Sequence, residues 1–317
     1  MHWKNAARSA LDGLGGLAAL RHLRRRRLRV PMFHSFRESD RANVEAICEH
    51  IARRFEPVPL SAIGPKLPDH AVSVTVDDGY RSFLLYGHPV FRRHRIPVTL
   101  YVVAGFADGR IWLWTDQVHF ALEHTAKSSL RAGIGDGEAF DLDLSSAEAK
   151  ARSATTLNEA LKRIPNERRL AFLEGLGSLC GIEIPSQPPP ECAAMSWDEL
   201  RAMAAEGVEI GCHTETHPIL SRLAGKRDLE REIRGAREML EQRLGFPVVH
   251  FCYPNGKPAD ISEAAVACVR DAGYATAVTC TYGLNPLEID RLRIRRLPWD
   301  SSTDPRYGAE LLVGLHV

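Results

Sequence analysis

The stretch AVSVTVDDGY, residues 71–80, predicts a buried strand that runs directly into a turn. Its first six residues are mostly β-branched, and Asp77, Asp78 and Gly79 follow at once. Similar apolar runs occur before and after it. We expect strands at residues 28–36, 71–76, 97–103, 208–212, 248–253, 275–280 and 292–299.

Segments whose apolar residues have helical spacing lie between these strands. This spacing is clearest at residues 43–55, 80–94, 228–244 and 261–272, and a capping-box pattern from Ser196 to Glu199 marks the start of another helix. Alternating strands and helices predict a parallel sheet with right-handed crossovers. About seven strands favour an α/β fold, a distorted (β/α) barrel, with an open doubly wound sheet as the alternative. In a barrel, reactive side chains collect at the carboxyl ends of the strands.

One long segment breaks this rhythm. Residues 108–191 are mostly polar with helical spacing, and they end just after three prolines at 188–190. We expect a helical insertion, which is either a lid over the site or a packing decoration. Residues 28–317 then form one domain that carries the insertion, and residues 1–27 form a basic N-terminal arm.

Composition excludes several classes of protein. The chain has 317 residues, of which 44% are apolar and 26% charged, and its net charge of +1 gives no general attraction to nucleic acid. Its seven cysteines are scattered without a CxxC pair, which argues against a zinc cluster or a disulfide framework. No apolar run approaches the roughly 20 residues of a membrane span.

The N-terminal region carries a basic run at residues 21–29, after a mildly apolar stretch. A secretory signal has the opposite order, so we expect a cytoplasmic protein. The basic run is either a solvated arm or a peripheral contact with an anionic membrane surface.

Five reactive residues follow predicted strands. Asp77 and Asp78 follow one strand, His213 and His217 follow another, and His34 ends the first. Two imidazoles and one carboxylate make a three-ligand metal site with open positions. Adjacent aspartates point in different directions, so one can bind the metal while the other accepts a proton from the attacking water.

Three motifs resemble, in order, those of the polysaccharide deacetylase family with its NodB-homology domain: VTVDDGY, GCHTETHP and HFCYPNG. The resemblance implies a metal-dependent hydrolase that removes an N-acetyl group from an amino sugar and releases acetate. The sugar would belong to a polysaccharide, an oligosaccharide, or a lipid- or nucleotide-linked glycan precursor. The implied metal is Zn²⁺, with Co²⁺, Ni²⁺ and Fe²⁺ as alternatives.

The resemblance also implies roles for individual residues. Asp77 matches the general base, and Asp78, His213 and His217 match the metal ligands. Asn255 sits where the family uses a backbone N–H to hold the tetrahedral oxyanion.

His34, in PMFHSF, resembles the early catalytic acid of the circularly permuted branch that includes poly-N-acetylglucosamine deacetylases. His316, in GLHV, is the alternative acid. Cys252 stands where many relatives carry an arginine that orients the base. Arg296 resembles a late arginine of the permuted branch and either supplies that charge or forms a structural ion pair.

Three aromatic residues, Tyr80, Tyr253 and Trp299, are candidates for stacking on sugar rings, with burial in the core as the alternative. Two other functions remain open at this stage. The same ligands could hold Fe²⁺ in a non-haem iron enzyme, or the chain could be a catalytically inactive carbohydrate-binding relative.

Overall fold

Seven parallel strands close into a barrel in this computed structural model, which describes residues 16–135 and 137–316. Each strand pairs with its neighbours in the chain, and β1 pairs with both β4 and β11, so the predicted barrel is confirmed and the open sheet is wrong. The strands in order are β1 (Pro31–Phe33), β4 (Val74–Val76), β5 (Val98–Val102), β8 (Glu209–Cys212), β9 (His250–Cys252), β10 (Thr276–Tyr282) and β11 (Ile294–Pro298).

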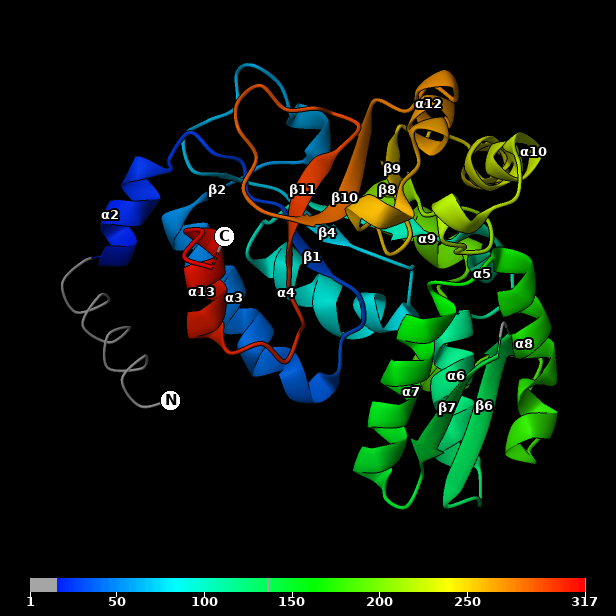
Figure 1. Cartoon of the computed structure of the whole chain (residues 1–317). Helices are drawn as coiled ribbons and strands as arrows, with labels where there is room; N and C mark the ends of the chain where they lie inside the picture. The colour runs from blue at the N-terminus through cyan, green and yellow to red at the C-terminus, as the bar shows by residue number, and fades with distance from the viewer. Residues whose placement is uncertain (1–15, 136, 317) are drawn as a thin grey trace.

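Helices surround the barrel on its outside (Figure 1). Two of the crossovers contain a π-helical turn, η3 (Phe83–Gly87) and η6 (Arg231–Gly235). A small parallel pair, β2 (Glu56–Pro57) and β3 (Ala71–Val72), lies apart from the barrel. The α-helices of this part are α3 (Arg41–Arg54), α4 (His88–Arg93), α5 (Ala104–Ala107), α9 (Trp197–Ala205), α10 (Lys226–Glu230), α11 (Ala236–Leu244), α12 (Glu263–Asp271) and α13 (Pro305–Leu312).

Helix α9 begins with the predicted capping box. The Ser196 hydroxyl accepts the Glu199 N–H at 3.3 Å, and the Glu199 carboxylate accepts the Ser196 N–H at 2.9 Å. Two otherwise unpaired donors of the first turn are thereby satisfied.

The insertion, residues 108–191, lies to one side of the barrel (Figure 1). Our prediction that it is helical is incomplete, because an antiparallel hairpin lies between its first and second helices. The hairpin forms because Leu130, Ala132 and Ile134 alternate with exposed residues and pack into a core that the insertion builds for itself. Its elements are α6 (Trp114–His124), β6 (Ser129–Gly135), β7 (Glu138–Asp143), α7 (Ala147–Leu161) and α8 (Asn166–Cys180).

The inner part of the expected basic arm is tied to the end of the chain. Arg29, just after the arm, is fully buried, and its Nε donates to the Leu312 carbonyl at 2.7 Å. Arg24 donates to the Val313 carbonyl at 2.9 Å. These contacts give the two arginines a structural role, and they do not support the membrane contact that was one of the two alternatives for the arm. Residues 1–15 of the arm lie outside the described residues.

No helix in the described ranges is both long enough and apolar enough to cross a membrane.

Candidate metal centre and active site

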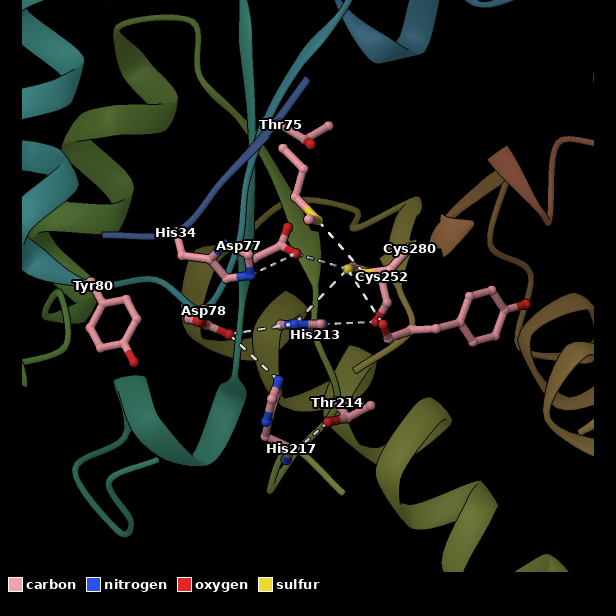
Figure 2. A network of polar contacts seen from close by, with 12 residues as sticks. His34, Thr75, Asp77, Asp78, Tyr80, His213, Thr214, His217, Cys252 and Cys280 are labelled. Carbon is pink, nitrogen blue, oxygen red and sulfur yellow. Dashed lines mark hydrogen bonds and ion pairs between the residues drawn. The ribbon is translucent and has the colours of Figure 1, made fainter. Parts of the chain in front are cut away.

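The reactive residues meet at the carboxyl ends of the strands (Figure 2). Asp77 and Asp78 follow β4, His213 follows β8, and His34 follows β1. Because all strands of the barrel are parallel, these ends share one rim, as the sequence pattern predicted.

Asp78, His213 and His217 form a candidate metal site. Asp78 Oδ1 lies 3.5 Å from Nε2 of each histidine, and the ligand atoms all lie within 4.8 Å of one another. Zinc bonds of about 2.0–2.1 Å place tetrahedral ligands about 3.4 Å apart, so this spacing suits one ion. Asp78 Oδ1 is also buried without a hydrogen-bond partner in the described part of the chain. A divalent ion would satisfy it, so the residues present fit a metal.

The protonation of the two imidazoles suits metal binding. Burial lowers the pKa of His213 to about 4, and burial together with His213 and Arg169 lowers the pKa of His217 well below its usual value. Both rings are therefore neutral near pH 7. The His213 Nδ1–H donates to the Cys252 carbonyl at 2.8 Å, which leaves Nε2 as the lone-pair atom that faces Asp78.

The loop that carries both histidines is held by a buried carboxylate. Glu232, in η6, accepts the N–H groups of Glu215 at 3.0 Å and Thr216 at 2.8 Å, and also the Thr216 hydroxyl at 2.6 Å. Sequence analysis missed Glu232, because an acidic residue within a strongly charged helix gives no sign that it is buried. The π-helical turn around it is a known companion of functional sites.

Helix α5 holds the same loop from another side. The Gly105 N–H donates to the Glu215 carbonyl at 2.9 Å, and a Cβ at Gly105 would lie 2.7 Å from that oxygen. Only glycine permits so close an approach.

Asp77 is held by Arg296 rather than placed among the metal ligands. The guanidinium of Arg296, on β11, donates to both carboxylate oxygens, at 2.7 and 2.8 Å. Both side chains are almost completely buried. Burial alone would raise the pKa of Asp77, but the charge and hydrogen bonds of Arg296 outweigh it and hold that pKa well below its usual range.

A second set of ligand atoms, from Asp77, His213 and Cys252, also lies within 4.8 Å. Both Asp77 oxygens are already engaged by Arg296, whose Nη2 also lies 3.2 Å from Cys252 Sγ. A guanidinium at that distance repels a cation, so the Asp78 set is the better metal site. Cys252, on β9, lies beside the guanidinium of Arg296, which reaches Asp77 from β11.

The structure brings His34, and not His316, to the site. His34 Nε2 lies 3.8 Å from Asp77 Oδ2, and its side chain is 46% exposed. His316 instead pairs with Glu310 at 2.8 Å, just beyond α13. His34 is thus partly open to solvent while it lies beside Asp77.

Asn255 has a left-handed backbone, with φ at 57°, and its side-chain amide donates to Asp260. This turn follows β9 at the same rim. The bond to Asp260 uses the side-chain amide of Asn255, so it does not involve the backbone N–H. The predicted oxyanion donor is therefore a backbone group on a fixed turn.

The three candidate sugar-stacking residues are buried instead. Tyr80 donates its hydroxyl to Asp116 at 2.7 Å, and Trp299 stacks on Phe33 with ring centroids 5.7 Å apart. Tyr253 packs edge-on against Phe251. None is more than 7% exposed. A stacking platform needs an open ring face, so the structure does not support that role for these side chains.

Comparison with protein families finds a match that includes part of the candidate site. Residues 179–277 match the model of the polysaccharide deacetylase family. That range contains His213, His217 and Asn255, while Asp77 and Asp78 precede it and complete the site in space. This part of the chain is thus similar to polysaccharide deacetylases. No curated protein matches this chain significantly in sequence.

Solved structures share its fold. The deacetylase PplD of Streptococcus pyogenes, in complex with acetate, aligns with a TM-score of 0.57 at 12% identity, over 90% of this chain and 98% of PplD. IcaB of Ammonifex degensii aligns with a TM-score of 0.55 at 16% identity, over 90% and 97%. The BpsB deacetylase domain of Bordetella bronchiseptica aligns with a TM-score of 0.53 at 15% identity, over 87% and 96%.

Proposed function

We propose that this deacetylase hydrolyses the acetamide of an N-acetylated amino sugar, with one divalent ion held by Asp78, His213 and His217. The observation that carries the proposal is the convergence of these three ligand atoms beside a separate, Arg296-bound carboxylate, Asp77. Asp78 faces both histidines as a metal ligand requires, while both oxygens of Asp77 are held by Arg296, which keeps this carboxylate apart from the metal ligands.

A divalent ion in this site would supply Lewis-acid polarisation of the amide carbonyl and acidification of water. Asp77 accepts the proton of the attacking water as the new C–O bond forms. His34 gives a proton to the amide nitrogen as the C–N bond breaks. The water keeps its second proton, which is released to solvent when the acetic acid ionises, so the products are acetate and the free amino sugar. Transfer of the proton gained by Asp77 to His34, directly or through solvent, restores both groups.

The low pKa of Asp77 supports metal dependence. A carboxylate stabilised by Arg296 is a weak base, which suits it to accept a proton from water that a bound metal ion would acidify. The same ion pair keeps Asp77 ionised throughout the neutral range. The backbone N–H of Asn255 would stabilise the negative oxygen that develops on the carbonyl, and one such donor is worth about 3 kcal/mol.

The types of ligand indicate which metal ions suit the site. Two imidazoles and one carboxylate suit Zn²⁺, with Co²⁺, Ni²⁺ and Fe²⁺ as alternatives. We propose an N-acetyl sugar of a glycan precursor, lipid- or nucleotide-linked, as the substrate class, and the cytoplasm as the compartment.

The test is acetate release from a panel of N-acetyl sugars, chitin oligomers, and lipid- and nucleotide-linked sugars. We expect the chelator-treated protein to release no acetate and stoichiometric Zn²⁺ to restore release. Thermal unfolding before and after chelation controls for loss of the fold. Equal activity of the stripped and the reconstituted protein would refute metal dependence, and metal uptake without release from any of these sugars would refute the deacetylase.

A further inference from the structure

The metal ligand His217 has an unfavourable backbone. Its φ is 57°, in the left-handed region that a residue with a side chain seldom adopts. Such a conformation is unfavourable and persists only where neighbouring contacts enforce it. Its N–H donates to the Thr214 hydroxyl at 3.1 Å, within the same loop.

The carbonyl of His217 is held by the insertion. Trp114 Nε1, at the start of α6, donates to this oxygen at 3.1 Å, and Arg169 Nη1, in α8, approaches it at 3.5 Å. Both donors belong to the insertion, outside the strands of the barrel. The insertion therefore reaches the metal site at a backbone atom of a ligand.

Arg169 is buried in the insertion without an ion-pair partner among the described residues. It is 3% exposed, and its guanidinium lies 4.6 Å from the centroid of the Trp114 ring. Its Nη2 donates to Asn166 at 2.5 Å, while its Nε has no partner among the described residues. Within those residues no carboxylate forms an ion pair with it, so only the more distant charge of Glu232 offsets the electrostatic cost of its burial.

We infer that Trp114 and Arg169 are positioning residues, and that the insertion clamps the strained backbone of His217 and thereby sets the metal affinity of the centre. This inference rests on the proposed metal-dependent function. It differs from both roles weighed for the insertion: a lid would act on the substrate, and a decoration would act on stability alone.

Whether a substitution raises or lowers the metal affinity depends on the side chain that it introduces. Arg169 places a positive charge near the site, which itself opposes binding of a cation, so removing that charge would mix two opposing effects. The clean variants keep the charge. Trp114→Phe removes one N–H donor, and Arg169→Lys shortens the reach while it retains the charge.

The insertion offers a matched control for Trp114. Trp112 is equally buried, packs edge-on against Phe120, and within the described part of the chain makes no hydrogen bond to Asp78, His213 or His217. Trp112→Phe removes the same atoms from the same segment, so it reports the cost of the substitution in packing alone.

The experiment measures the Kd for Co²⁺ by direct titration of the full-length, metal-free protein. The visible absorption of the bound Co²⁺ reports its coordination, and thermal unfolding without metal reports the fold. We expect Trp114→Phe and Arg169→Lys each to weaken Co²⁺ binding about 10-fold or more and to alter the absorption bands, because groups that orient ligands typically contribute 10–100-fold to metal affinity. Trp112→Phe should change the Kd less than about twofold at a comparable loss of thermal stability.

Two outcomes would overturn the inference while the proposed metal site stands. Wild-type affinity and spectrum in Trp114→Phe would remove the clamp and leave the metal site intact. Equal weakening by Trp112→Phe and Trp114→Phe would reduce the insertion to a packing role. A wild-type protein that binds no Co²⁺ or Zn²⁺ would instead overturn the proposed function, and this inference with it.

Discussion

Asp77→Asn is expected to slow acetate release about 10²–10⁴-fold, the usual contribution of a positioned general base. The amide has nearly the same shape as the carboxylate but cannot accept the proton of the attacking water. Asp77 contacts Arg296 and is not among the atoms that face His217, so the metal should remain bound. The measurement is acetate release per metal ion, with metal content determined on the same sample.

A matched variant distinguishes the base from the ligand. Asp78→Asn changes the neighbouring carboxylate by the same atoms, and it should lose metal as well as activity. Unchanged turnover in metal-loaded Asp77→Asn would remove Asp77 from the mechanism. Loss of metal in both variants would show that the two aspartates do not have separate roles.

Arg296→Met is expected to destabilise the protein by about 3–5 kcal/mol, the cost of removing one partner of a buried ion pair. Its guanidinium donates to both Asp77 oxygens and to the Thr279 carbonyl, and it is 1% exposed. Methionine fills much of the space but leaves the Asp77 charge buried without a partner. Urea unfolding of the metal-free proteins measures the difference in unfolding free energy.

An exposed pair provides the comparison. Arg131 lies 3.4 Å from Asp141 across the hairpin of the insertion, and both side chains are mostly exposed. Arg131→Met should therefore cost no more than about 1 kcal/mol. A loss of that small size in Arg296→Met as well would contradict a structural role for the buried pair.

The stability that the Asp77–Arg296 ion pair contributes should also depend on pH. The folded-state pKa of Asp77 lies below its usual value, so the pair contributes its full stability above about pH 4 and loses it as the pH falls towards the folded-state pKa. The difference between wild type and Arg296→Met should therefore shrink in acid.

Local sequence patterns were sufficient for the barrel and for the centre of its site. Each strand is a short apolar run, and the reactive residues follow directly where a run ends, so parallel pairing alone brings Asp78 to His213. The approach of Arg296 to Asp77 was anticipated only through a resemblance, since 219 residues separate them.

Other features could not be predicted, because they depend on contacts between distant segments. Glu232 looks like one more charge on a charged helix until the loop folds over it. Trp114 and Arg169 belong to a segment that looks polar and independent, and only the folded chain shows that they meet at His217. The hairpin was missed because its alternation of buried and exposed residues is short and glycine-rich.

The central claim is that Asp78, His213 and His217 hold one divalent ion. Its most direct test is a crystal structure of the Zn²⁺-loaded protein with anomalous diffraction at the zinc edge. We predict one strong peak, bonded to Asp78 Oδ1 and to Nε2 of both histidines at about 2.0–2.2 Å. An empty site at full zinc loading, or a peak bound instead by Asp77, His213 and Cys252, would contradict the account.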